Sequence, residues 1–449
     1  MGRFLAFVRS PYFNENQTLV RLAEALVDLG LSAEKDVVWS VICPGREFDD
    51  LCLRRWASEL LALAATFMVQ EQATKHPGTQ GVQLLDALRE REAHNLYSFY
   101  HRKQQPDPEE PESQIDSQSL LHAYLLEAGH NAWLAEQANR SGITNLDAAV
   151  ANLDRFYLFN KLKYACTLLN NRNIVGPAAH DPFIEGLIRE LTAQRFEDDP
   201  AIALYFRIYQ MLSRPDEGGH YLQLRAMLTQ YAQAFTREEA RHLYAFALNY
   251  CIGRINAGEG TFLREIFGLY QEALERNVLL ERDRLSPWDY KNIVVVGLRL
   301  SEFGWVESFI HGYRNRIPAD HRDNAFTYNL AKLHFYKRQY SEVLRLLQVL
   351  EYEDVFYNLD AKTMLLKIYF ELHEIEALDS LIESFRTFLR RNKLISDSHR
   401  TNYLNLILFV KKLSRVRYGD HKRLLKIRAD FEATRQIADA DWLREKMGE

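Results

Sequence analysis

The side chains with the greatest intrinsic reactivity, cysteine and histidine, are scattered along this 449-residue chain. The cysteines are Cys43, Cys52, Cys166 and Cys251. They form no CxxC pair and have no metal-like spacing, so we expect buried free thiols in a reducing compartment. Among the fourteen histidines, His94 and His101 lie two turns apart on one helix face. Two imidazoles alone do not complete a zinc site, so we expect a surface or core pair rather than a metal centre.

The sequence contains none of the common catalytic motifs. There is no P-loop, no GxGxxG after a strand, no GxSxG and no HExxH. Carboxylates are abundant, but no pair is set apart by its spacing. We therefore predict that the protein is not an enzyme and needs no cofactor or metal. An enzyme whose active site is assembled from distant residues stays an alternative. A deep pocket that contains several titratable groups with shifted pKa values would support it.

The strongest pattern in the sequence is a repeat of 34 residues, with units at 290–323, 324–357 and 358–391. Four pairs of residues share the spacing: Glu342 and Glu376, Val343 and Ala377, Leu344 and Leu378, and Leu347 and Leu381. One unit earlier, the equivalents of Leu330, Ala331, His334 and Val343 are Val296, Gly297, Leu300 and Phe309. A fixed period in this range is typical of stacked helical hairpins, each of which buries its apolar face against the next.

This stretch resembles the tetratricopeptide repeat (TPR) family. The matching residues are Leu330 with the small Ala331, the aromatic Phe335 and Tyr340, and Glu342-Val343-Leu344 at the start of a second helix. The sequence departs from the family at Val343 and Phe309, where the family prefers a small residue. The resemblance implies an all-α fold, namely a right-handed α-solenoid of TPR-like helical hairpins.

We expect three segments: a small N-terminal helical domain at 1–105, an acidic, proline-rich linker at 106–116, and the TPR-like solenoid at 117–449. Three prolines and four acidic residues between Pro106 and Ser113 indicate the linker.

Near the start of the chain, Asn16 or Thr18 can cap a helix that Gly30 ends. Ile293–Val296 is β-branched but lies inside the helical period, so we predict helix there.

The sequence also resembles a group of bacterial helical proteins that have no assigned activity. The similarity lies in Ser10-Pro11-Tyr12-Phe13-Asn14, and in Leu153-Asp154-Arg155-Phe156-Tyr157 leading to Asn170-Asn171-Arg172. It supports a helical architecture and implies no function.

The TPR family binds partners in a concave groove lined by the first helix of each hairpin, so the resemblance implies such a groove here. By position, its residues are Lys291, Leu298, Tyr328, Asn329, Lys332, Phe335, Lys362, Leu366 and Tyr369. Asn329, Lys332 and Lys362 are similar to part of a clamp with which some members hold a C-terminal carboxylate. Val294 and Leu298 stand where that clamp needs polar residues. We therefore prefer a mixed aromatic and cationic groove for an acidic or extended peptide, with a merely solvated concave face as the alternative.

A second set of candidate binding residues follows the repeats. Between Arg386 and Arg428 there are thirteen Lys or Arg residues and two Asp residues, a local charge of +11 in a chain of net charge −5. The candidates are Arg390, Arg391, Lys393, Lys411, Lys412, Arg415, Arg417, Lys422 and Arg423. Such a run is typical of a surface for nucleic acid, a ribosome or an acidic protein. A solubilising end cap, or salt bridges to the acidic remainder of the chain, would have the same composition.

The sequence therefore predicts a non-enzymatic scaffold that binds a partner peptide or protein in the groove of its repeats. The alternative is a nucleic-acid or ribonucleoprotein binder that acts through the basic C-terminal helices 386–428. Salt distinguishes the two, because binding to phosphates weakens steeply as salt rises. The longest apolar run, Leu60–Val69, is too short to span a membrane, and no secretion signal opens the chain. We expect no membrane insertion and a cytoplasmic location, while the partner's identity and the oligomeric state stay open.

Overall fold

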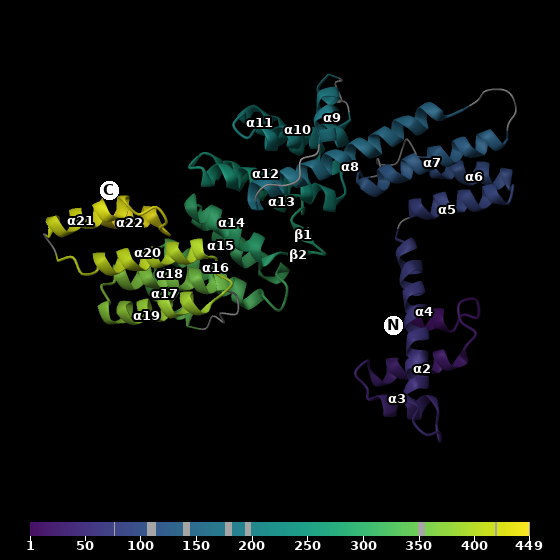
Figure 1. The fold of residues 1–449 in the computed structure, drawn as a ribbon, viewed down its shortest axis with the longest axis horizontal. Coiled ribbons are helices and arrows are strands. Elements are labelled where there is room, and N and C mark those ends of the chain that lie inside the picture. Colours follow the sequence, from purple (N-terminus) through teal and green to yellow (C-terminus); the bar gives the residue numbers. More distant parts are fainter. Residues whose placement is uncertain are drawn as a thin grey trace. The chain divides into compact units, whose positions relative to one another are not determined.

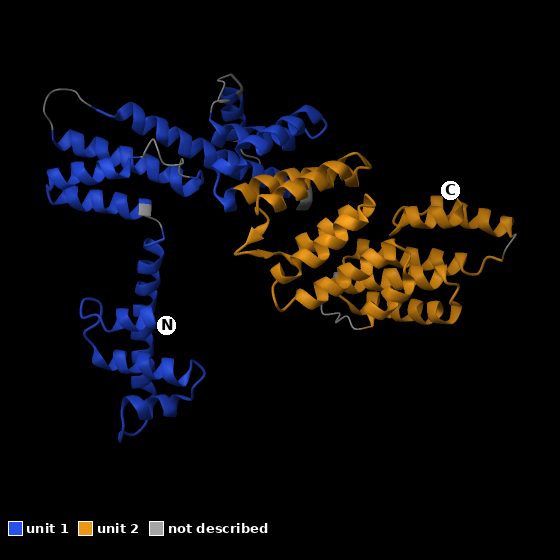
Figure 2. Cartoon of the chain, turned by 180° about the vertical axis from the view of Figure 1, so that it is seen from behind, with its two compact units in different colours: residues 1–239 blue, residues 240–449 orange. Residues whose placement is uncertain are grey.

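The computed structural model describes residues 1–75, 77–105, 114–137, 144–175, 182–193, 199–348, 355–417 and 420–448. Over these ranges the chain forms 22 α-helices, two short 3₁₀ helices and one hairpin of two short strands (Figure 1). The all-α prediction is confirmed. The chain divides into two compact units, residues 1–239 and 240–449 (Figure 2). Of the linker predicted at 106–116, residues 106–113 lie outside the described ranges, so this boundary stays a prediction.

Within its described ranges, unit 1 is built from helices. They are α1 (Gly2–Val8), α2 (Gln17–Leu29), α3 (Lys35–Ile42), α4 (Asp50–Ala73), α5 (Pro77–Glu90), α6 (His94–Gln104), α7 (Ser117–Glu136), α8 (Leu146–Val175), α9 (Pro182–Ala193), α10 (Pro200–Ser213), α11 (Gly218–Tyr231) and the 3₁₀ helix η1 (Ala232–Ala234). The Asn16 side chain caps α2 by accepting a hydrogen bond from the Thr18 amide, and Gly30 ends the helix at a φ of +87°. Both helix signals in the sequence are thus confirmed.

The cysteines and the most apolar helices were the subjects of two further predictions. All four cysteines are free. Cys166 and Cys251 are buried, whereas Cys43 and Cys52 are half-buried. No helix within the described ranges has the length and apolar character that crossing a membrane requires.

Unit 2 consists of helical hairpins that follow one another along the chain. Its elements are α12 (Arg237–Asn256, which begins in unit 1), α13 (Phe262–Glu275), β1 (Leu280–Glu281), β2 (Arg284–Leu285), α14 (Pro287–Arg299), α15 (Phe303–Tyr313), the 3₁₀ helix η2 (Arg314–Arg316), α16 (Arg322–Tyr336), α17 (Tyr340–Leu347), α18 (Val355–Glu371), α19 (Ile375–Arg391), α20 (Asp397–Leu413), α21 (His421–Glu432) and α22 (Ala440–Met447). The β-branched Ile293–Val296 lies within α14, as predicted.

The hairpins α14–α15, α16–α17 and α18–α19 turn through three-residue loops of one conformation. The middle residue of each loop, Ser301, Arg338 or His373, has a positive φ of +61°, +57° or +57°. The next amide donates to a carbonyl five residues earlier, as in the Schellman motif at helix ends. The loops therefore recur after 37 and 35 residues, whereas the sequence pattern predicts 34.

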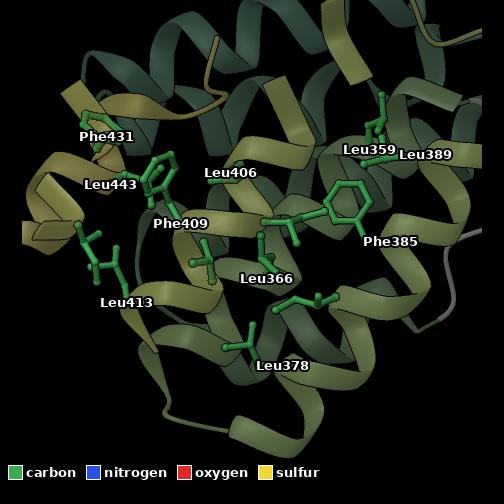
Figure 3. Packing of buried hydrophobic residues seen from close by; sticks show 14 of the residues in the cluster. Leu359, Leu366, Leu378, Phe385, Leu389, Leu406, Phe409, Leu413, Phe431 and Leu443 are labelled. Atoms are coloured by element: carbon green, nitrogen blue, oxygen red, sulfur yellow. The ribbon is translucent and has the colours of Figure 1, made fainter. Parts of the chain in front are cut away.

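One apolar core joins α18, α19, α20, α21 and α22 (Figure 3). Phe385 of α19 is fully buried in it. Phe409 of α20 meets Phe431 of α21 edge-on, with their ring centroids 5.4 Å apart. Leu443 and Met447 fix α22 to the same core. A smaller core joins α16, α17 and α18, so the first helices of successive hairpins are held side by side.

Candidate partner-binding face

Three lysines gather in unit 2, one from the first helix of each hairpin. They are Lys291 of α14, Lys332 of α16 and Lys367 of α18, and α16 packs against both of the other helices. Asp360 of α18 and Asp439, which precedes α22, supply the opposing charges. We call these five residues the lysine–carboxylate cluster.

Asp360 is the centre of the cluster. Its Oδ2 accepts hydrogen bonds from Lys291 Nζ and from the Tyr328 hydroxyl, each at 2.7 Å. Lys332 Nζ lies 3.8 Å from the same oxygen and donates to the Tyr328 hydroxyl at 3.0 Å. The Asp360 side chain is 27% exposed. One half-buried carboxylate therefore ties together the first helices of three hairpins.

Aromatic rings surround the amine of Lys291. Its Nζ lies 5.6 Å from the Trp288 ring centroid, 5.4 Å from that of Tyr328 and 5.1 Å from that of Tyr357. The two tyrosine rings meet edge-to-face at 4.6 Å. A cation over an aromatic face gains roughly 0.5–2 kcal/mol, and more as water is excluded. The rings thus replace part of the water that the ammonium loses on burial.

The C-terminal helix α22 reaches the far end of the cluster. Asp439 Oδ2 lies 2.7 Å from Lys367 Nζ, whose charge also lies 5.3 Å from the Trp442 ring centroid. Trp442 packs edge-on against Phe370 of α18 at 5.4 Å. Lys446 Nζ pairs with Glu371 at 2.6 Å. The chain's own C-terminal segment therefore supplies one of the two carboxylates of the cluster.

Burial and charge act against each other within the cluster. Burial lowers the pKa of Lys332, although Asp360 and Asp439 act to raise it. Burial tends to raise the pKa of Asp360, but Lys332 and Lys291 bring it below its ordinary value. With its amines protonated, the cluster holds three positive and two negative charges. One positive charge thus has no counterpart within the cluster.

The structure brings together three of the residues predicted to line the groove, Lys291, Tyr328 and Lys332. Phe335 lies on the same face of α16 and packs with Tyr340, their ring centroids 6.1 Å apart. These residues share a face because three-, four- and seven-residue steps return to the same side of a helix.

The remaining predicted groove residues lie elsewhere. Asn329 is fully buried, and its Nδ2 donates to the carbonyl of Ala325 at 2.8 Å. Lys362 lies over the Phe388 ring of α19 at 5.7 Å, and burial lowers its pKa. Tyr369 packs on the core around α19 and α20, and Leu298 and Leu366 are buried. The amide of Asn329 thus bonds within its own helix and Lys362 contacts α19, whereas Lys332 contacts Asp360.

Sequence reasoning missed Asp360, Lys367 and Asp439. Because the loops recur after 35 residues between the last two hairpins, Lys367 and not Leu366 corresponds to Lys332. A shift of one residue turns the helix face by about 100° and exchanges a buried leucine for a lysine. The loop residues with positive φ could have signalled the shift, but they are Ser, Arg and His rather than glycine.

The predicted basic residues divide into paired and unpaired sets. Lys412 pairs with Asp430 at 2.5 Å, and Lys411 and Arg415 lie 3.8 and 3.7 Å from acidic residues of α19. Six of the predicted basic residues are exposed and have no ion-pair partner among the described residues, namely Arg390, Arg391, Lys393, Arg417, Lys422 and Arg423. The first three adjoin the start of α20 and the last three follow its end, roughly 25 Å away at 1.5 Å per residue.

The histidine pair noted in the sequence lies in unit 1. His94 Nδ1 lies 2.7 Å from the Gln137 amide nitrogen, whereas His101 stacks on His130 of α7 with ring centroids 3.8 Å apart. Tyr97 and Trp133 continue this stack, with their centroids 4.7 Å apart. No group of three or more His, Cys, Asp or Glu side chains among the described residues could hold a metal ion.

Comparisons of the chain with family models, with curated proteins and with solved structures found no match.

Proposed function

We propose that the protein is a non-enzymatic scaffold that binds a protein partner through the lysine–carboxylate cluster and the aromatic rings around it. The observation that supports this proposal is the unequal charge of the cluster, with three lysines against two aspartates. A carboxylate from a partner would complete the pairing and would meet amines that are already positioned. The partner we propose therefore carries an acidic residue in an extended or helical segment.

We further propose that unit 2 is a right-handed, TPR-like solenoid, with the first helices α14, α16 and α18 on its concave side. Three hairpin loops of one conformation support this proposal. Equivalent buried positions in the second helices, Val306, Val343 and Leu378, recur with the same 37- and 35-residue steps. In such an array each hairpin contacts its neighbours and offers its first helix to a ligand.

The test is capture of partners by the tagged full chain from the cells that make it, with low- and high-salt washes, with and without nuclease. The informative variant is Lys332→Met, which removes one amine but keeps most of its volume. Lys393→Met is the matched control, because Lys393 is exposed. We expect Lys332→Met to weaken capture about tenfold, the weight of one charge-assisted hydrogen bond. Equal capture by both variants would contradict the proposal.

The unpaired cations at the end of the repeats favour a second candidate function, nucleic-acid or ribonucleoprotein binding. Phosphate contacts release counterions, so such binding would be lost with high salt or nuclease. A triple change of Arg417, Lys422 and Arg423 to Glu would then abolish capture, and Lys332→Met would leave it unchanged. The same capture experiment thus separates the two functions.

A further inference from the structure

A second site in unit 2 lies at the hairpin of β1 and β2, and it shares no residue with the lysine–carboxylate cluster. The two strands pair antiparallel, with Leu280 opposite Leu285 and Glu281 opposite Arg284. The turn between them consists of Arg282 and Asp283, which both have positive φ, +49° and +63°. Two-residue turns of this shape favour Asn and Gly, because other residues are strained there. The geometry of the turn therefore does not explain why an arginine occupies this position.

Ion pairs hold the hairpin from both sides. Asp283 pairs with Arg316 at 2.9 Å, and Glu281 pairs with Arg241 of α12 at 2.9 Å. Leu280 and Leu285 are buried beneath it. The two buried leucines thus anchor the strands on either side of the turn that carries the Arg282 side chain.

A cavity of about 640 Å³ opens beside this hairpin. Arg241, Arg282 and Arg284 line it together with Asp289 of α14, and Leu285 and Pro318 give it an apolar side. The volume is in the range of small-molecule sites, which combine an apolar surface with a few polar groups.

The charges in the cavity are unequal. Glu281 compensates Arg241, whereas Arg282 and Arg284 have no ion-pair partner among the described residues. The three arginines and the two carboxylates, Glu281 and Asp289, give the cavity lining a net charge of +1, which favours an anion. The planar N–H groups of the two guanidinium groups that have no ion-pair partner suit phosphate oxygens. Asp289 is half-buried in the same cavity and can accept a hydrogen bond from a hydroxyl group.

We propose that this cavity binds a small phosphorylated organic molecule, whose phosphate contacts Arg282 and Arg284 and whose hydroxyl groups contact Asp289. Leu285 and Pro318 cover the apolar part of the ligand. The site is independent of the proposed partner-binding face, and either one can exist without the other.

Calorimetric titration of the full chain tests this inference. The probes are adenosine monophosphate and glucose 6-phosphate, with adenosine, glucose and inorganic phosphate for comparison. We expect at least one phosphate ester to bind, more tightly than inorganic phosphate, and its uncharged parent not to bind. Replacing Arg282 and Arg284 by Ala should weaken binding more than tenfold. The control pair Arg21→Ala and Arg46→Ala, which removes two exposed arginines of unit 1, should leave it unchanged.

Arg282→Gly separates a binding role from a structural one. Glycine adopts the positive φ without strain, so this variant should raise the thermal unfolding temperature while it weakens binding of the ester. A lower unfolding temperature would show that Arg282 serves the fold, and would overturn the inference. Absence of binding by either ester, or equal loss in the control pair, would also overturn it. Lys332→Met should not affect the titration, so failure here is distinct from failure of the partner-binding proposal.

Discussion

The lysine–carboxylate cluster of unit 2 and the histidine stack of unit 1 are both groups of half-buried titratable side chains, but they handle charge in opposite ways. In unit 2, Lys291 and Lys332 are charged groups that share the carboxylate of Asp360. In unit 1, His101 and His130 stack at 3.8 Å, and burial lowers the pKa of both. In the first cluster two carboxylates offset most of the positive charge, whereas in the second burial favours neutral rings.

This difference is the reason why we propose recognition at the lysine–carboxylate cluster and not at the histidine stack. Two imidazoles in face-to-face contact cannot both be charged without strong repulsion, so the stack serves the packing of α6 and α7. The cluster of lysines retains an unpaired positive charge and bonds that a ligand can exchange. Among the described residues, neither the His130 Nδ1 nor the Trp133 Nε1 atom has a hydrogen-bond partner. Burial of these two polar atoms therefore lowers the stability of the stack.

A substitution of Asp360 tests the comparison between the two clusters most strongly. Replacing Asp360 by Asn leaves the half-buried Lys291 and Lys332 without the carboxylate that they share. We expect the free energy of unfolding to fall by about 2–3 kcal/mol, somewhat below the value for fully buried pairs because Asp360 keeps some exposure. Urea unfolding followed by circular dichroism measures this loss. Asp441→Asn is the matched control at an exposed aspartate, and an equal, small change in both variants would contradict the role of Asp360.

Acidification should affect the two units differently. Burial lowers the pKa of His101, His122 and His130, so below pH about 6.5 the unfolded chain binds more protons than the folded chain. The stability that neutral histidines support is present above this pH and is lost as the pH falls. The pKa of Asp360 is below its ordinary value of 3.8, so its ion pairs persist at pH 5.

Segment-resolved amide hydrogen exchange at pH 7 and pH 5, corrected for intrinsic rates, measures this difference. We expect protection of α6 and α7 to fall at pH 5 and protection of α16 and α18 to stay. His101→Phe with His130→Phe keeps stacked rings and removes the titrating nitrogens of the stack, so the pH dependence of α6 should vanish and that of α7 should fall to the part that His122 contributes. Glu127 and Glu136 of α7, Asp86 and Arg89 of α5, and His94 also face the stack and remain in that variant. Equal loss in both units would contradict the comparison.

Asp439→Asn sharpens the account of unit 2, because it releases Lys367 from its partner on the C-terminal segment. The pair is partly exposed, so the unfolding free energy should fall by less than about 1 kcal/mol. Capture of an acidic partner should rise, since a second amine becomes available. Asp441→Asn should change neither quantity. Reduced capture would mean that the partner needs Asp439 itself.

The smallest expected effect concerns the repeated loops. His373 is exposed and has a φ of +57°, a conformation that glycine adopts at lower cost. His373→Gly should therefore raise the unfolding free energy of unit 2 by up to about 1 kcal/mol. Thermal unfolding measures the gain, with His399→Gly inside α20 as the opposite control that should destabilise. A loss at His373 would mean that the histidine side chain itself stabilises the loop.

The sequence was a good guide to local structure and a poor guide to register. Apolar periodicity and the signals at Asn16 and Gly30 predicted helices and a cap that the structure contains. A step of 34 residues from Tyr328 and Lys332 leads to Lys362 and Leu366. The observed step of 35 residues leads to Thr363 and Lys367 instead. Leucine, valine and isoleucine fill equivalent core positions almost interchangeably, so the pattern tolerates a shift of one residue.

Contacts between distant residues were beyond sequence reasoning altogether. Lys367 contacts Asp439 only because α22 packs back against α18, and no local sequence pattern predicts this contact. Arg282 and Arg284 join Arg241 in one cavity through the hairpin of β1 and β2, which the helical reading of the chain did not include.

Zero-length coupling of carboxylates to amines tests the central claim most directly. A captured partner is treated with a carbodiimide, and the joined peptides are identified by mass spectrometry. The account predicts links from aspartate or glutamate residues of the partner to Lys332, Lys367 or Lys291, beside the internal links of these lysines to Asp360 and Asp439. Partner links confined to Lys393 and Lys422, with none in the cluster, would contradict it.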